Sequence, residues 1–173
     1  MENLGCWYDN AKLTIAVNKD SKAKTIGDLK SMGDDYGNTL YGIEAGAGLT
    51  KVTQQSAIPK YGLKNLNFKI SSTPAMLSQL KKATAANRDI AVTLWRPHWA
   101  YGAFPVRDLE DPKNAMGDAE VIYSFARPGF EKDFPKAAQL MRNMAFDDKT
   151  LSDLEDTMFS ADTVSYTHLR AHE

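Results

Sequence analysis

The sequence has little cysteine, no excess of charge of either sign and no long apolar run, and each absence excludes a class of protein. The single cysteine, Cys6, excludes an intrachain disulfide and supports no metal cluster. The 21 basic and 22 acidic residues nearly balance, which gives no electrostatic argument for binding nucleic acid or an anionic membrane surface. No apolar stretch is long enough to span a bilayer. A chain of 173 residues can still bury a sizeable core as one domain.

The two ends of the sequence are uninformative about function. No basic segment followed by an apolar one occurs after Met1, so there is no signal-peptide pattern, and by this criterion alone the chain would be cytosolic. The last residues, Ser165 to Glu173, show no apolar period, which favours a disordered or foreign tail. His168 and His172 have the i, i+4 spacing of helical metal ligands, but no third ligand is near, so no metal site is predicted.

Strand patterns alternate with helix patterns along the chain, which predicts an α/β fold with a mainly parallel sheet. The predicted strands are residues 13–17, 39–43, 67–71, 90–94 and 120–126. The predicted helices are residues 26–32 after a Thr25–Asp28 capping box, 49–57 closed by Pro59, one capped by Ser72 or Thr73, one capped by Asp133, and 149–159 with Asp147 and Asp148 at its positive end. The residues between Trp99 and Glu120 are expected to be a long irregular segment.

A glycine-rich turn, Glu44 to Leu49, joins the second predicted strand to the next helix. Backbone N–H groups at the start of a helix are free and positively polarised, which suits a carboxylate or phosphate. Gly46 and Gly48 let a ligand approach the backbone closely. The turn matches neither a phosphate-binding P-loop nor a full dinucleotide fingerprint. An ordinary tight βα turn explains the same residues equally well.

The stretch Trp95-Arg96-Pro97-His98-Trp99 follows the buried strand 90–94. Ligands of open α/β sheets bind at the carboxyl ends of the strands, and an indole there offers a flat, electron-rich wall. The alternative is that Trp95 and Trp99 are core residues at a strand end, which is the commoner fate of tryptophan.

Evidence for an enzyme is weak. No Gly-x-Ser-x-Gly elbow occurs, and the acidic pairs are sequence neighbours typical of turns and caps. His98 is the one credible catalytic histidine, and a histidine that fixes its loop by a hydrogen bond is the simpler interpretation. Binding is therefore better supported than catalysis, and no cofactor is implied.

Four stretches in order resemble one family, the substrate-binding proteins of ABC importers for glycine betaine and related quaternary amines. The similarity extends from about Leu4 to about Phe159, and residues 94–101 look most similar to actinobacterial-type members. The stretches that carry it are residues 42–49, 71–77, 95–99 and 108–113.

The resemblance implies a two-lobed, type II periplasmic-binding-protein-like fold with the ligand in the cleft between lobes. In the family, backbone N–H groups of the glycine turn bind the ligand carboxylate, and the matching positions here are Gly48 and Leu49. A box of tryptophans encloses the trimethylammonium, and the matching residue is Trp95. Cation–π contact suits a quaternary ammonium, which has no N–H to donate. Gly46 and His98 complete the expected set of ligand-binding residues, with no catalytic residue.

The resemblance also implies a longer protein, because family members carry an upstream segment with a signal peptide, much of the first lobe and a further Trp-x-Pro element. The chain is therefore expected to be the later part of such a receptor, and Trp7 is not assigned to the box. Residues 1–19 are expected to form a crossover strand and entry segment, 20–118 a nearly complete ligand-binding lobe, 119–160 part of the other lobe, and 161–173 the tail. Exposed apolar surface and open strand edges are expected where strands of the partial lobe are missing.

The expected function is the capture of glycine betaine or a similar zwitterion, outside the cytoplasm, for an ABC permease and its ATPase. Contact with a membrane is expected only through the transporter or a lipid anchor. Choline, carnitine, proline betaine and proline are alternative ligands. Two alternative functions remain: an enzyme acting on a small carboxylate with His98 as acid or base, and a sensory or scavenging domain of the same fold.

Overall fold

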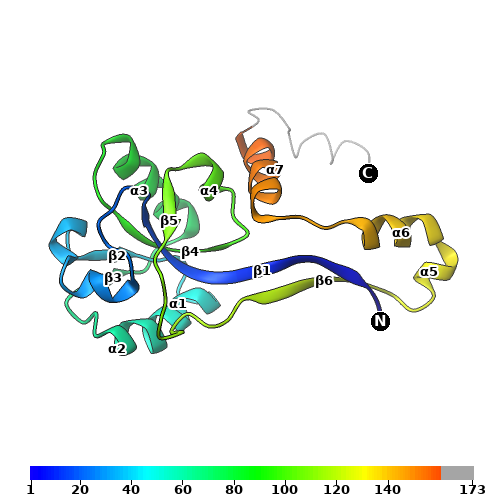
Figure 1. Ribbon diagram of the computed structural model, residues 1–173, viewed down its shortest axis with the longest axis horizontal. Coiled ribbons are helices and arrows are strands. Elements are labelled where there is room, and N and C mark those ends of the chain that lie inside the picture. The colour runs from blue at the N-terminus through cyan, green and yellow to red at the C-terminus, as the bar shows by residue number, and fades with distance from the viewer. Residues whose placement is uncertain (161–173) are drawn as a thin grey trace.

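The computed structural model describes residues 1–160, and its long first strand pairs with three of the other strands. Strand β1, Glu2–Asn18, pairs through its second half with β4, Ala91–Arg96, and β5, Val106–Asp108. Its first half pairs with β6, Glu120–Ala126, in an irregular register. Figure 1 shows the β1–β6 ribbon leading from the main sheet to the last helices. The strand expected at residues 13–17 is therefore longer, because β6 supplies a partner for the residues before it.

The main sheet is mixed. Its strand order is β3, Asn67–Lys69, then β2, Thr39–Tyr41, then β4, β1 and β5. Strand β2 runs parallel to both β3 and β4, as predicted, whereas β1 runs antiparallel to its partners. The α/β class and the alternation of strands and helices along this part of the chain are confirmed. The mainly parallel arrangement holds only for the β3–β2–β4 half, because the long strand β1 enters the sheet from the opposite direction.

The core surrounds this sheet, and the strand residues predicted to be buried form its centre. Ile15, Val17, Leu40, Val92 and Leu94 are fully buried. Side chains alternate between the two faces of a strand, and cross-strand partners share a face. Leu13, Ile15, Thr93 and Trp95 therefore lie on one face of the β1–β4 pair, and Lys12, Thr14, Leu94 and Arg96 lie on the other.

The segment after the glycine turn is one continuous helical stretch. It comprises α1, Gly48–Val52, a π-helical turn, Thr53–Ala57, and α2, Ile58–Tyr61. The prediction that Pro59 closes the helix is wrong. A proline ring clashes with the carbonyl four residues before it in a regular helix, and the π-helical turn widens the backbone at that position. The stretch ends instead at Gly62, which has the left-handed conformation (φ 66°).

Two predicted helix starts are confirmed. Helix α3, Thr73–Ala85, begins after Ser72, whose Oγ accepts a hydrogen bond of 3.3 Å from the backbone N–H of Ala75. Its residues Met76, Leu80 and Ala83 are buried, as their spacing predicts. The helix after Thr25 is a 3₁₀ helix, Ile26–Lys30, with the expected capping box to Asp28. A further 3₁₀ turn, Gly33–Tyr36, precedes β2.

The segment expected to be irregular contains two elements, the short helix α4, Ala100–Ala103, and strand β5. Both are too short to give a sequence period, and β5 exists because the end of β1 pairs with it.

Up to residue 160, three helices follow β6: α5, Phe130–Asp133, α6, Pro135–Asn143, and α7, Asp148–Ser160. Asp133 does not cap α6 as predicted, because it ends α5 and forms a 2.5 Å ion pair with Arg127. Asp147 does cap α7, accepting a hydrogen bond from the N–H of Thr150. Figure 1 shows α6 at the far end of the ribbon and α7 returning toward α4.

Part of the predicted apolar stripe of α7 is exposed. Leu151 is buried, whereas Leu154 and Met158 are exposed. In residues 1–160, every helix is too short or too polar to cross a bilayer. The predicted tail and its two histidines lie outside the described residues.

Candidate functional site

The glycine turn and the Trp95 stretch lie at the same edge of the sheet. Strands β2 and β4 are adjacent and parallel, with Tyr41 opposite Val92. The chain therefore leaves β2 into the turn and reaches Trp95 on β4 in the same direction. Helix α1, which follows the turn, contacts β4. Two segments separated by nearly fifty residues are brought together at the carboxyl ends of neighbouring strands, where α/β sheets place ligands.

The turn itself exposes backbone that a small ligand can reach. Ala47 is extended and precedes the first helical residue, Gly48. A Cβ atom added at Gly46 or Gly48 would meet no atom within 4 Å, so both positions face open space. Leu49 is buried in the core and anchors the start of the helix. N–H groups in the first turn of a helix have no carbonyl acceptor within the helix. Those of Gly48 and Leu49 are therefore available to an anion.

Glu44 fixes the turn against the start of α3. Its Oε1 accepts a hydrogen bond of 2.7 Å from the N–H of Thr73, and its Oε2 accepts one of 2.9 Å from the Thr73 hydroxyl. These bonds lower the pKa of the Glu44 carboxyl. Ser71 donates a further hydrogen bond to the carbonyl of Gly42. Sequence analysis missed this role of Glu44, although an acidic residue at a strand end and a Ser-Thr-Pro helix start were both visible.

Trp95 is both a packing residue and a partly exposed one. It lies opposite Leu13 of β1 and packs against the core, yet its side chain is only half-buried. The His98 and Trp95 rings meet edge to face, with 4.4 Å between centroids, and the Trp99 ring stacks on His98 at 5.6 Å. A cis peptide bond joins Arg96 to Pro97. Part of the Trp95 side chain therefore packs in the core, and its role as the wall of a site stays a prediction.

His98 fixes its own loop, as the simpler interpretation predicts. Its Nδ1 accepts a hydrogen bond of 3.0 Å from the backbone N–H of Ala100, so the neutral ring carries its proton on Nε2. The side chain is 5% exposed, and burial lowers the pKa of His98 to about 4. A histidine with this pKa is a poor general base at neutral pH.

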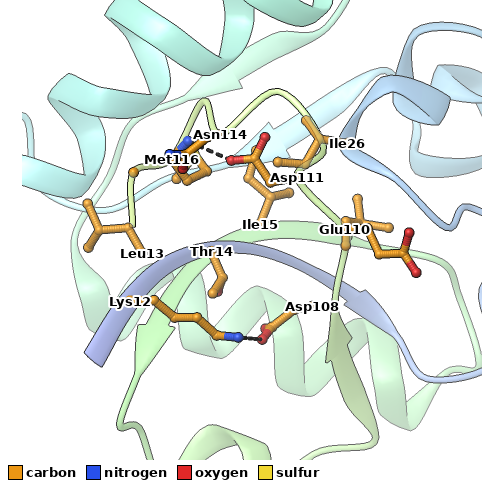
Figure 2. A pocket seen from close by; sticks show the side chains of 12 residues that line it. Lys12, Leu13, Thr14, Ile15, Ile26, Asp108, Glu110, Asp111, Asn114 and Met116 are labelled. Atoms are coloured by element: carbon orange, nitrogen blue, oxygen red, sulfur yellow. Dashed lines mark hydrogen bonds and ion pairs between the residues drawn. The ribbon is translucent and has the colours of Figure 1, made fainter. Parts of the chain in front are cut away.

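A separate cavity of about 290 Å³ lies beside β1 and β5. Its wall includes Leu13, the cross-strand neighbour of Trp95, and the loop after β5 (Figure 2). Asp111 in this wall accepts hydrogen bonds from the hydroxyl of Tyr61 (2.6 Å) and the N–H of Met116 (2.7 Å), and with these bonds its pKa is lowered despite partial burial. None of the five predicted ligand-binding residues lines this cavity. Within residues 1–160, no cluster of three His, Cys, Asp or Glu side chains is arranged to hold a metal ion.

Comparison with known proteins identifies one family. The family model of the substrate-binding domain of ABC-type glycine betaine transport systems matches residues 1–167. The glycine betaine/carnitine transport binding protein GbuC of Listeria monocytogenes is 40% identical over 131 residues, which are 75% of this chain and 42% of that protein.

Solved structures agree with this assignment. The glycine betaine/L-proline-binding protein ProX of Borrelia burgdorferi is 30% identical, with a TM-score of 0.74 over 98% of this chain and 64% of that one. Lactococcal OpuAC, solved with glycine betaine, is 28% identical, with a TM-score of 0.72 over 94% of this chain and 63% of that one. The chain thus spans less than half of the curated relative and under two thirds of these structures. The predicted binding-protein fold and the resemblance to this family are confirmed, and the family is one of transport binding proteins, not enzymes.

Proposed function

The chain belongs to the family of substrate-binding domains of ABC-type glycine betaine transport systems, and on that premise we propose that it captures glycine betaine or a related quaternary amine for uptake. GbuC, a glycine betaine/carnitine transport binding protein, and the structure of OpuAC with glycine betaine support this ligand class. The observation that carries the proposal is the position of the glycine turn and Trp95 on adjacent parallel strands.

The ligand carboxylate binds the backbone N–H groups of Gly48 and Leu49. Three observations support this role: the open space around Gly46 and Gly48, their place at the start of a continuous helical stretch, and the anchoring of the turn through Glu44. A carboxylate at a helix start is stabilised both by free N–H donors and by the helix dipole.

The quaternary ammonium contacts the face of Trp95. A cation over an indole gains about 0.5–2 kcal/mol, and the gain rises as water is excluded. His98 supports this wall from the side, because its ring packs against the indole and is itself held by Ala100. At neutral pH the uncharged His98 adds no repulsion to a cationic ligand.

The partners are an ABC permease and its ATPase, and the site of action is outside the cytoplasm. Any contact with the membrane passes through the transporter or a lipid anchor. Residues 20–118 form the ligand-binding lobe, residues 1–19 the crossover, and residues 119–160 part of the second lobe. Closure of the lobes on the ligand is the signal that the permease recognises, since tighter binding to the closed form shifts the population toward it.

A calorimetric titration of the chain tests this proposal. Glycine betaine is compared with glycine, which keeps the carboxylate but lacks the three methyl groups, and with choline, which keeps the quaternary ammonium but lacks the carboxylate. We expect glycine betaine to bind more tightly than either. Absence of heat with all three contradicts the proposal, and turnover of a small carboxylate that is lost in His98→Ala would favour the enzyme alternative.

A further inference from the structure

A polar array lies on the face of β4 opposite Trp95, and Arg96 is at its centre. The Nε of Arg96 donates a hydrogen bond of 2.8 Å to Oδ2 of Asp108, and its guanidinium lies 3.8 Å from the ring centroid of Tyr101. The Tyr101 hydroxyl lies 2.5 Å from Oδ1 of Asp108 and 2.8 Å from the hydroxyl of Thr14. Lys12 adds an ion pair to Asp108 at 3.7 Å, which Figure 2 shows on the same side of β1 as Thr14.

The same array continues to the last helix. Nη1 of Arg96 lies 3.6 Å from Oδ2 of Asp148, the first residue of α7. Asp148 also accepts hydrogen bonds from the hydroxyl of Tyr8, at 2.6 Å, and from the side-chain amide of Asn10, at 2.9 Å. Arg96 therefore joins three parts of the molecule: the strand end that carries Trp95, strand β5 through Asp108, and the start of α7 through Asp148.

We propose that Arg96, held between Asp108 and Asp148, is a positioning residue for Trp95, and that ligand affinity at Trp95 therefore depends on the docking of α7. The proposal rests on the proposed function and adds a dependence of the site on a distant helix. Arg96 touches no ligand; it acts through the backbone that it shares with Trp95.

The geometry of this array requires arginine rather than a generic cation. A planar guanidinium can stack on an aromatic ring while it donates a hydrogen bond to one carboxylate and forms an ion pair with a second, which a lysine ammonium cannot reproduce. The Arg96 side chain is 18% exposed and that of Asp108 is 19% exposed, so water weakens the Arg96–Asp108 contact less than a surface ion pair, whereas the Asp148 side chain is 39% exposed. Because Asp108 and Asp148 both hold the Arg96 side chain, rotation of the strand end at Arg96 is restricted, and the adjacent indole keeps its orientation.

The test uses the full chain with Trp7→Phe and Trp99→Phe, so that Trp95 is the only fluorophore of its type. This parent is compared with Asp148→Asn, Asp148→Glu and Arg96→Lys. Asp133→Asn is the matched control, because it removes one partner of an exposed Arg127–Asp133 ion pair at a distance from the array. Trp95 emission and acrylamide quenching are measured without ligand, and glycine betaine affinity is measured by calorimetry.

We expect Asp148→Asn and Arg96→Lys to shift Trp95 emission to the red, to increase quenching, and to weaken glycine betaine binding about threefold or more. Asp148→Glu should keep Trp95 emission, quenching and glycine betaine affinity close to those of the parent, and Asp133→Asn should change none of them. Unchanged quenching and affinity in folded Asp148→Asn and Arg96→Lys would overturn the proposal, as would equal changes in Asp133→Asn. If the unmodified chain fails to bind glycine betaine, the proposed function fails, and the quenching comparison alone decides whether Arg96 positions Trp95.

Discussion

The imidazole of His98 lies edge-on against the indole of Trp95, with ring centroids 4.4 Å apart and planes inclined at 86°. The same imidazole accepts a hydrogen bond from the N–H of Ala100, at the start of α4. The orientation of Trp95 is thus connected to a neutral, buried histidine. Protonation of His98 would remove the acceptor at Nδ1 and place a charge between two tryptophans.

Stability should fall on mild acidification because of His98. Burial depresses the pKa of His98 to about 4 in the folded state, against about 6.5 when unfolded. Between these values the unfolded chain binds the extra proton, so the free energy of unfolding decreases as pH falls through this window. We expect a loss from this residue of up to about 1.4 kcal/mol per pH unit below 6.5, and no change from it above about pH 7. Urea denaturation at pH 7.5, 6 and 5 measures it.

The control for this prediction is His98→Asn, whose side-chain oxygen can accept the Ala100 hydrogen bond but cannot titrate. Burial raises the pKa of Glu155, so this residue increases the free energy of unfolding as the pH falls. It is present in both proteins and cancels in the comparison. The difference between them isolates His98. Parallel pH profiles for the two would contradict the assignment.

Removal of the indole should weaken ligand binding without abolishing the fold. Trp95→Ala deletes the proposed cation–π wall, and we expect a loss of about 1 kcal/mol or more in glycine betaine binding, about fivefold in the dissociation constant. Trp7→Ala is the control, because Trp7 packs on Phe146 near the other end of the molecule. Equal affinity in Trp95→Ala and the unmodified chain, measured by calorimetry, would remove Trp95 from the site.

Gly48→Ala should separate binding from stability. A methyl group at Gly48 meets no protein atom within 4 Å, and alanine favours a helical conformation, so we expect stability to stay equal or rise by about 0.5 kcal/mol. The same methyl group occupies space next to the N–H groups assigned to the carboxylate, and glycine betaine binding should weaken about threefold or more.

Gly62→Ala is the opposite control. Its φ of 66° is strained for alanine, so it should lose about 1 kcal/mol of stability and leave affinity unchanged. Thermal denaturation and calorimetry on both variants complete the comparison. Unchanged ligand affinity in Gly48→Ala would show that the carboxylate binds elsewhere.

The sequence predicted those features that depend on neighbouring residues. The cap of α3, expected at Ser72 or Thr73 and found at Ser72, and the strand at residues 120–126 were predicted because each has a local signal, a helix-start residue or a run of strand formers. The meeting of the glycine turn with Trp95 agrees with the predicted parallel strands, because neighbouring parallel strands end at the same edge of a sheet.

Features that depend on distant partners were missed. Strand β5 has three residues and forms because the end of β1 pairs with it. Arg96, Asp108 and Asp148 come from β4, β5 and α7, and no spacing in the sequence shows that their side chains meet. The continuation of the helix past Pro59 depends on a π-helical turn, which has no simple sequence pattern.

The side chain of Thr93, next to the site, should lower the free energy of unfolding. Its hydroxyl is buried without a hydrogen-bond partner among residues 1–160, on the face of β4 that also carries Trp95. A buried unsatisfied polar group costs about 1–3 kcal/mol, so Thr93→Val should raise the free energy of unfolding by about 1 kcal/mol. Val92→Thr, which introduces a hydroxyl at a neighbouring buried position, should lower it. Chemical denaturation measures both, and destabilisation by Thr93→Val would indicate that the hydroxyl has a partner, such as a bound water.

The exposed face of β6 should make the chain self-associate. Val121, Tyr123 and Phe125 alternate along β6 and are 45%, 45% and 59% exposed. Among the described residues β6 pairs only with β1, so its other edge is open, and an open edge beside apolar side chains favours pairing with another chain. Phe125→Lys places a charge on this face and should shift sedimentation velocity profiles toward the monomer at high concentration. Gln55→Lys adds the same charge on an exposed helical turn away from β6 and should have little effect. If both variants reduce association equally, net charge rather than the β6 face controls it.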